Sequence, residues 1–153
     1  MVLLLQYTLI FSSVLILVAL GGCFAEHSGV INLGLEGIMV LGALGGALVM
    51  RYFGDSISGA ALVLLVLLGS VLFGVVYSTL LGVASINFKA DQTLVGTAMN
   101  LLGTAGATVI VKAINTAANP DDVSSAIQYA TPKTAFIVNI GKFEFNWFRS
   151  EER

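Results

Sequence analysis

Few residues of this chain carry groups that could do chemistry, and the most informative ones lie inside apolar stretches. Glu36 is the one charged residue between Leu33 and Met50. At the centre of a bilayer a carboxylate costs about 2.5–3.5 kcal/mol on insertion scales, so it usually faces a cavity or a partner. Asn32 can instead cap a helix that places Glu36 in its first turn, where the helix dipole favours negative charge. A structural role and a pathway-lining role therefore both stay open for Glu36.

A polar stripe lies further along the chain. Spacings of four, three, four and four residues place its members on one helical face, and they are Thr93, Thr97, Asn100, Thr104 and Thr108. Threonine hydroxyls can bond to carbonyls of their own helix, whereas the amide of Asn100 needs a partner helix, water or a solute. The stripe therefore indicates either one wall of a pathway or hydrogen bonding between helices.

Small residues form another pattern. Gly42 and Gly46 are four residues apart, and Ala43 and Ala47 repeat that spacing beside them. Small residues four apart lie on one helix face and let a second backbone approach closely, which drives helix association in lipid. We predict that these four residues pack a helix bundle.

Signatures of common enzymes are missing from the sequence. Gly141 and Lys142 are followed by Phe143, so there is no phosphate-binding loop, and neither a G-x-S-x-G elbow nor an H-E-x-x-H pair occurs. His27 and Cys23 are the single residues of their types, which excludes a histidine pair and a disulfide framework. A net charge of −2 without a basic tract argues against nucleic acid as a partner. We expect no catalytic residue, no metal and no cofactor in this chain.

Long uncharged segments must position these groups. Of 153 residues, 57% are hydrophobic and 10% are charged, against about 25% charged in an average soluble domain. A bilayer core needs roughly 20 mostly apolar residues per helix. We predict an all-α, polytopic transmembrane helix bundle with spanning helices near residues 2–23, 33–50, 59–81 and 94–113. The first segment is predicted to be an uncleaved membrane helix, because no positive region precedes it, although Leu20–Cys23 faintly resembles a lipoprotein cleavage box.

The composition changes near Asn115, which divides a transmembrane domain (1–115) from a predicted interfacial or extracytoplasmic loop and tail (116–153). Pro120 and the acidic residues after it predict a short helix over Val123–Tyr129. Aromatic residues beside charges after Thr134 suit the headgroup zone, and an ordinary amphipathic tail explains them equally well. The few Lys and Arg residues do not fix the orientation.

Two ordered stretches resemble a known family. Residues 24–43 read FAEHSGVINLGLEGIMVLGA, and residues 87–102 read NFKADQTLVGTAMNLL. Both are similar to signatures of bacterial ABC-transporter permeases of the branched-chain amino-acid and simple-sugar group, in particular the subgroup paired with basic membrane lipoproteins. Asp91 departs from the more usual asparagine. The resemblance covers residues 1–115 well and the tail loosely.

The resemblance implies a multi-pass permease subunit of the cell (inner) membrane that imports a small polar solute, such as a nucleoside or simple sugar, by alternating access. The implied partners are an ABC ATPase subunit that uses ATP and Mg, a second permease subunit and an extracytoplasmic substrate-binding lipoprotein, with lipid around the helices. The resemblance also implies that residues 26–32 and 88–93 face the cytoplasm. Because the ATPase-docking segment of such permeases is missing, the chain is expected to be an N-terminal half.

Within this hypothesis, Asn32, Glu36, Asn100 and Thr104 are predicted to line or brace a central cavity. Two alternatives stay open. One is a non-transporting scaffold or assembly fragment that binds other membrane chains through its glycine faces. The other is a small secondary transporter, which is disfavoured because the first two segments and the last two show no clear internal repeat.

Overall fold

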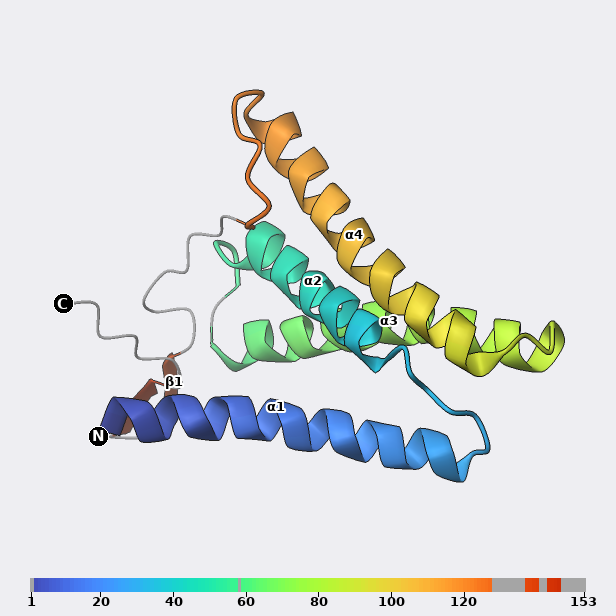
Figure 1. Ribbon diagram of the computed structural model, residues 1–153. Helices are drawn as coiled ribbons and strands as arrows, with labels where there is room; N and C mark the ends of the chain where they lie inside the picture. The colour runs from blue at the N-terminus through green and yellow to red at the C-terminus, as the bar shows by residue number, and fades with distance from the viewer. Residues whose placement is uncertain (1, 58, 128–136, 141–142, 147–153) are drawn as a thin grey trace.

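The computed structural model describes residues 2–57, 59–127, 137–140 and 143–146 (Figure 1). Four long helices dominate it: α1 (Val2–His27), α2 (Leu35–Phe53), α3 (Ala60–Gly82) and α4 (Gln92–Ala118). Each is long and apolar enough to cross a membrane, which confirms the predicted bundle of four spanning helices.

All four helices extend beyond at least one predicted end, and α3 and α4 show this most clearly. α3 continues as a π-helix over Val83–Asn87, where a loop was expected. α4 begins at Gln92 because the Asp91 carboxylate accepts hydrogen bonds from Thr93 N at 2.8 Å and Leu94 N at 3.3 Å. An acidic N-cap of this kind satisfies backbone N–H groups that have no partner within the helix.

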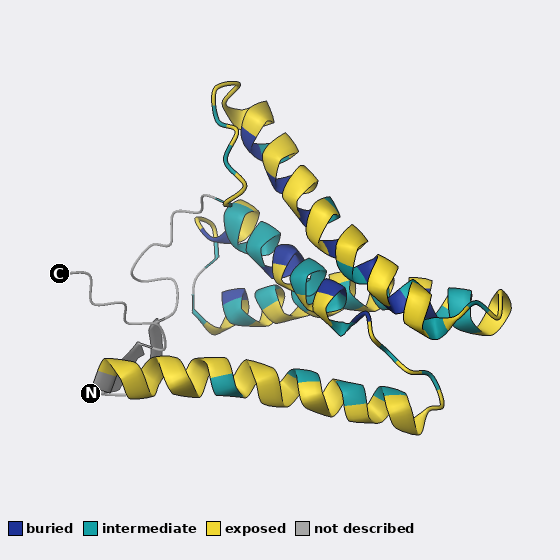
Figure 2. Ribbon diagram, in the orientation of Figure 1, coloured by how far each residue is buried: buried dark blue, intermediate teal, exposed yellow. Residues whose placement is uncertain are grey.

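α2 lies between α3 and α4 and contacts both, whereas α1 stands apart (Figures 1 and 2). One buried cluster joins Leu44 of α2 to Ala107 and Val111 of α4. A second joins Tyr77 and Leu81 of α3 to Met99 of α4. Most α1 side chains are exposed in this chain, and their apolar character suits lipid.

Glycines set the distance between α2 and α3. A Cβ atom on Gly45 would lie 2.7 Å from Gly69 O, and one on Gly42 would lie 3.3 Å from Ser70 O. A Cβ on Gly46 would clash with Ser70 Oγ. The two backbones therefore approach more closely than larger residues would allow.

The prediction of a short helix over Val123–Tyr129 is wrong for its described part. Residues 123–127 are not helical, and Tyr129 lies outside the described residues. The reason is that Asn115 Nδ2 donates to Ser124 O at 3.1 Å and to Ala126 O at 2.8 Å, which holds this segment as an irregular loop.

An antiparallel hairpin, which the sequence did not lead us to expect, follows in the tail. β1 (Ile137–Ile140) pairs with β2 (Phe143–Asn146), with Ile137 opposite Asn146 and Ile140 opposite Phe143. The interfacial placement of the tail stays a prediction, as does the division at residue 115.

Candidate functional site

The two stretches that carry the family resemblance lie against each other at the N-terminal ends of α2 and α4. Gln92, in the first turn of α4, accepts a hydrogen bond at its Oε1 from Ile31 N at 2.7 Å. One turn further on, a Cβ on Gly96 would lie 2.8 Å from Leu33 Cβ and 3.1 Å from Gly34 N. The loop that leads into α2 is therefore held directly against α4.

Asn100 makes the most specific contact of this region. Its Oδ1 accepts from Gly37 N at 2.8 Å, and its Nδ2 donates to Leu33 O at 2.8 Å. Gly37 belongs to the first turn of α2, where backbone N–H groups lack partners within the helix. Asn100 thus caps α2 from the neighbouring helix and satisfies both its own donor and its own acceptor.

Glycines make room for this link. A Cβ on Gly37 would lie 2.6 Å from Met99 O, and a Cβ on Gly103 would lie 2.8 Å from Gly37 Cα. Our sequence analysis did not select Gly37, Gly96 or Gly103. The signal was available, because Gly96 and Gly103 are seven residues apart, two helical turns, and Asn100 lies between them.

Asn32 does not cap α2, contrary to the role considered above. The N-cap position is Gly34, which has no side-chain cap, and Asn32 Oδ1 accepts from Gly34 N at 3.0 Å within the preceding turn. α2 starts later than the predicted residue 33, because Leu33 O accepts a hydrogen bond from Asn100 of α4. Glu36 does lie in the first turn of α2, and its side chain is exposed.

The threonines of the stripe behave differently from Asn100. Thr97, Thr104 and Thr108 donate to carbonyls of their own helix at 2.7–3.0 Å, and all three are exposed, as is Thr93. Only the amide of Asn100 crosses to α2. The hydroxyl oxygens keep lone pairs that can accept a hydrogen bond from a solute.

Helical geometry places these exposed polar groups on one side of the α2–α4 pair. The two helices run parallel, since Gly37 contacts Asn100, Leu44 contacts Ala107, and Arg51 contacts Asn115. Met99 turns toward Tyr77 of α3. Successive residues of a helix lie about 100° apart around its axis. Glu36 of α2 and the threonines of α4 therefore lie on the side of the helix pair that points away from α3.

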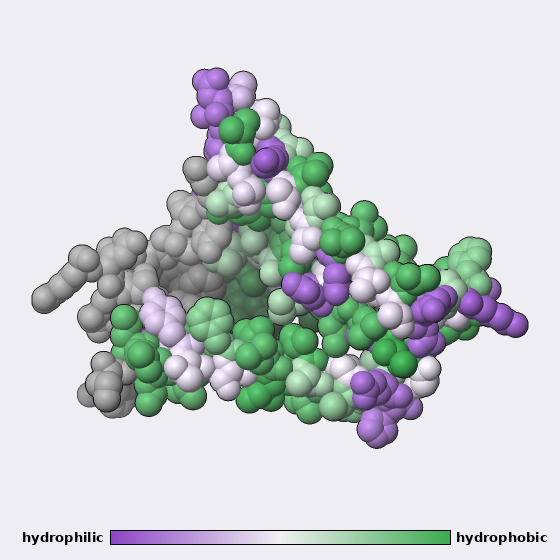
Figure 3. All heavy atoms as spheres, in the orientation of Figure 1, coloured by the Kyte–Doolittle hydropathy of each residue, from purple (hydrophilic) through white to green (hydrophobic). Residues whose placement is uncertain are grey.

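We call this side the polar face and define it by Glu36, Thr97, Thr104 and Thr108. Figure 1 views the molecule with α3 behind α2 and α4, and Figure 3 shows white to purple residues in a band along α4 in this view. Gly42 and Gly46 lie on the opposite side against α3, Ala43 is exposed, and Ala47 is half-buried.

A second polar cluster lies at the C-terminal ends of α2 and α4. Asn115, of which only 2% is exposed, accepts at Oδ1 from Arg51 Nη1 at 2.7 Å. Its Nδ2 group donates to Ser124 and Ala126 in the loop after α4. Hydrogen bonds from Ser124 lower the pKa of the Asp122 carboxyl, and the charge of Arg51 contributes further. We name Arg51, Asn115, Asp122 and Ser124 the C-terminal cluster, which sequence analysis also missed.

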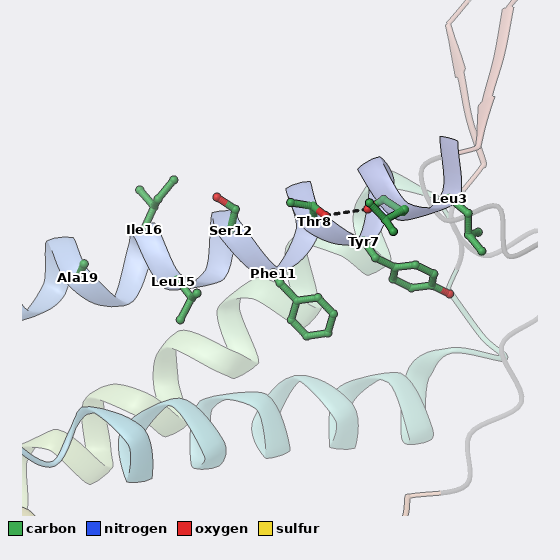
Figure 4. Close-up of a pocket in the computed structure, with 9 residues that line it drawn as sticks. Leu3, Tyr7, Thr8, Phe11, Ser12, Leu15, Ile16 and Ala19 are labelled. Carbon is green, nitrogen blue, oxygen red and sulfur yellow. Dashed lines mark hydrogen bonds between the residues drawn. The ribbon is translucent and has the colours of Figure 1, made fainter. Parts of the chain in front are cut away.

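An open apolar groove of about 930 Å³ runs along α1 (Figure 4). Among the described residues, its lining comes from α1 and includes Tyr7, Phe11 and Leu15. The hydroxyl of Thr8, which also lines the groove, donates a hydrogen bond to Leu4 O at 2.8 Å within the same helix. The described residues that line the groove are mostly apolar, so they offer an apolar surface.

Residues 4–146 match the family described as the branched-chain amino acid transport system permease component. The guanosine ABC transporter permease of Bacillus subtilis is 40% identical over 141 residues, which are 91% of this chain and 44% of the relative. The nucleoside ABC transporter permease of Lactococcus lactis is 38% identical over 97 residues, which are 63% of this chain and 30% of the relative. No solved structure matches the chain.

The chain thus spans less than half the length of these relatives. The match nevertheless covers all four membrane-spanning helices and both stretches joined by Gln92 and Asn100. This chain is an integral membrane protein, and it belongs to the family described as the branched-chain amino acid transport system permease component.

Proposed function

We propose that this chain is the N-terminal half of a permease subunit in an ABC importer, and that the imported solute is a nucleoside. The names of the guanosine and nucleoside permeases support this solute class over a simple sugar. ATP and Mg would bind in a separate ATPase subunit. A second permease subunit and an extracytoplasmic substrate-binding lipoprotein would complete the transporter, with residues 26–32 and 88–93 on the cytoplasmic side.

The polar face is the observation that carries the proposal. In lipid, a solute rich in hydroxyl and amide groups needs hydrogen-bonding partners along its route, because water is absent. Glu36 and the hydroxyl of Thr104 are exposed on the same side of the α2–α4 pair. We assign these two groups to the wall of the pathway. Asn32 and Asn100 brace it, since their amides are already bonded to the backbone.

The roles of Glu36 and Thr104 follow from their hydrogen-bonding capacity. A carboxylate accepts strong hydrogen bonds from sugar hydroxyls, and a threonine hydroxyl accepts one while it donates to its own helix. A nucleoside carries no net charge, so the carboxylate serves as an acceptor and no ion pair is needed. Alternating access would expose this face first to one side of the membrane and then to the other.

The test is uptake of labelled guanosine by cells that express the complete permease, of which this chain is the proposed N-terminal half, together with the companion permease, ATPase and lipoprotein. We expect saturable, ATP-dependent uptake that disappears when this chain is deleted. Thr104→Val should raise the KM roughly two- to tenfold, the equivalent of one hydrogen bond. Leu102→Ala, on the opposite side of α4 and 59% exposed, is the matched control and should leave the KM unchanged.

Glu36→Gln extends the test, because an amide is a weaker acceptor than a carboxylate and should also raise the KM. Its control is Glu26→Gln, an exposed carboxylate near the end of α1. Uptake that persists without this chain would overturn the proposal. Recovery of the assembled complex without any uptake would favour the scaffold alternative.

A further inference from the structure

We infer that α2 and α4 move as one unit during transport, with Asn100 and Asn115 as the positioning residues that hold the two helices together near both ends. α1 is then a separately attached helix. The functional meaning of this inference rests on the proposed transport function, whereas the geometry behind it does not.

The first link fixes α2 in register with α4. Asn100 binds two backbone groups of the α2 entry, Leu33 O and Gly37 N, each at 2.8 Å. Sliding or rotation of α2 would break both hydrogen bonds at once. Gln92 adds a third hydrogen bond to the same segment through Ile31 N.

The second link lies at the opposite end. Asn115 is buried and receives a hydrogen bond from Arg51 in the last turn of α2, at 2.7 Å. Asn100 and Asn115 are 15 residues apart along α4, since 115 minus 100 is 15, which corresponds to about 22 Å of helix. One link would leave a hinge, but two links at this separation resist both tilt and rotation.

Close packing fills the interval between the two links. A Cβ on Gly103 would lie 2.8 Å from Gly37 Cα, and Leu44 packs with Ala107 and Val111 in a buried cluster. Packed interfaces of this kind shift between discrete arrangements and do not deform continuously. The two helices therefore cannot separate anywhere along their interface while the hydrogen bonds of Asn100 and Asn115 persist.

α1 is attached in a different way. It meets α2 near its C-terminal end, where a Cβ on Gly22 would lie 3.3 Å from Leu35 Cδ1. Among the described residues, its side-chain hydrogen bonds stay within its own helix, and Ser28 in the following turn donates to Ala25 O of α1. Relative movement within this chain should therefore occur between α1 and the α2–α4 unit.

Spin-label distances in lipid nanodiscs test the inference. In a Cys23→Ala background, labels at Met39→Cys and Val109→Cys report on α2 and α4, and labels at Leu9→Cys and Val109→Cys report on α1 and α4. All three labelled positions are exposed. We expect one narrow distance for the α2–α4 pair and a broad or shifting distribution for the α1–α4 pair.

Replacing both positioning residues, Asn100→Leu with Asn115→Leu, should broaden the α2–α4 distribution. Thr108→Val is the matched control on the same helix, because its hydroxyl bonds only to Thr104 O, and it should leave the distribution narrow. A broad α2–α4 distribution in the unmodified pair, or no change in the double variant, would overturn the inference. This measurement does not depend on transport activity.

A transport measurement then tests the functional part. A disulfide between Leu44→Cys and Ala107→Cys would join α2 to α4 covalently within their shared cluster. We expect guanosine uptake to survive oxidation. Uptake that is lost on oxidation and restored by reductant would contradict the inference. Absence of uptake even before oxidation would instead contradict the proposed function, and the spin-label result would still decide the inference.

Discussion

The side-chain oxygen of Asn100 accepts the backbone N–H of Gly37 at 2.8 Å, so a residue of α4 caps the first turn of α2. The same amide donates to Leu33 O, also at 2.8 Å. Asn100 therefore joins α4 to the N-terminal end of α2.

Asn100→Leu should destabilise the fold, because it leaves Gly37 N and Leu33 O without partners. The expected cost is about 1–3 kcal/mol, measured by thermal or denaturant unfolding in detergent. Asn100→Asp keeps the acceptor for Gly37 N but loses the donor and adds charge, so it should not restore wild-type stability. Thr97→Val, which removes only a bond within α4, is the control and should cost much less. Equal losses for Asn100→Leu and Thr97→Val would contradict this assignment.

Gly103→Ala should also destabilise the fold, since the new methyl group would lie 2.8 Å from Gly37 Cα and push the two backbones apart. Overpacking of this kind costs about 1–3 kcal/mol. Gly106→Ala is a sharp control on the same helix, because a Cβ there meets nothing within 4 Å. It should be neutral or stabilising by up to about 1 kcal/mol, since alanine has the higher helix propensity. Identical effects at the two glycines would refute the close approach at position 103.

Tyr77→Phe removes the hydroxyl that donates to Met99 O at 2.6 Å between α3 and α4. We expect a loss of about 1 kcal/mol in unfolding free energy, because Tyr77 is buried and its ring keeps its packing. Tyr52→Phe is the matched control, with a side chain that is 63% exposed. A stability change at Tyr52 as large as that at Tyr77 would show that the hydrogen bond to Met99 is not the cause.

The loop after α4 should loosen at acid pH. Hydrogen bonds from Ser124, followed by the charge of Arg51, lower the pKa of Asp122 below its usual 3.8. A group whose pKa is lowered by folding stabilises the folded form above its unfolded pKa, and this stabilisation is lost as pH falls through the folded pKa. Amide exchange of residues 119–127 should therefore speed up below pH 3.8 relative to the intrinsic exchange rate. Asp122→Asn should remove this pH dependence, and a profile that is unchanged in the variant would contradict it.

The spanning helices could be predicted because long uncharged stretches have few stable arrangements outside lipid. Stretches without charged residues located all four helices. The ends of the helices, however, depend on contacts between helices that the hydrophobic pattern does not reveal. α2 starts after Gly34 because α4 holds Leu33, and α3 continues into the π-helix beyond Leu81.

The partners of polar residues were harder to predict. Periodicity placed Asn100 on a face with the threonines, yet it could not say which helix covers that face. Asn115 was assigned to the boundary of the tail because polar residues follow it, although its burial comes from Arg51 and from a loop further along the chain. The links from Asn100 to Gly37 and from Arg51 to Asn115 join residues more than 60 positions apart, and a single sequence carries no direct trace of them.

The cap on α2 also sets an order of events during synthesis. Gly37 and Asn100 are separated by 63 positions, which a ribosome covers in roughly 3–13 s. Throughout that interval α2 has entered the bilayer with an amide that lacks its final partner. Until α4 emerges, water or a lipid headgroup at the membrane surface must satisfy this amide, and a stalled chain that ends before residue 100 should be a preferred target of membrane quality control.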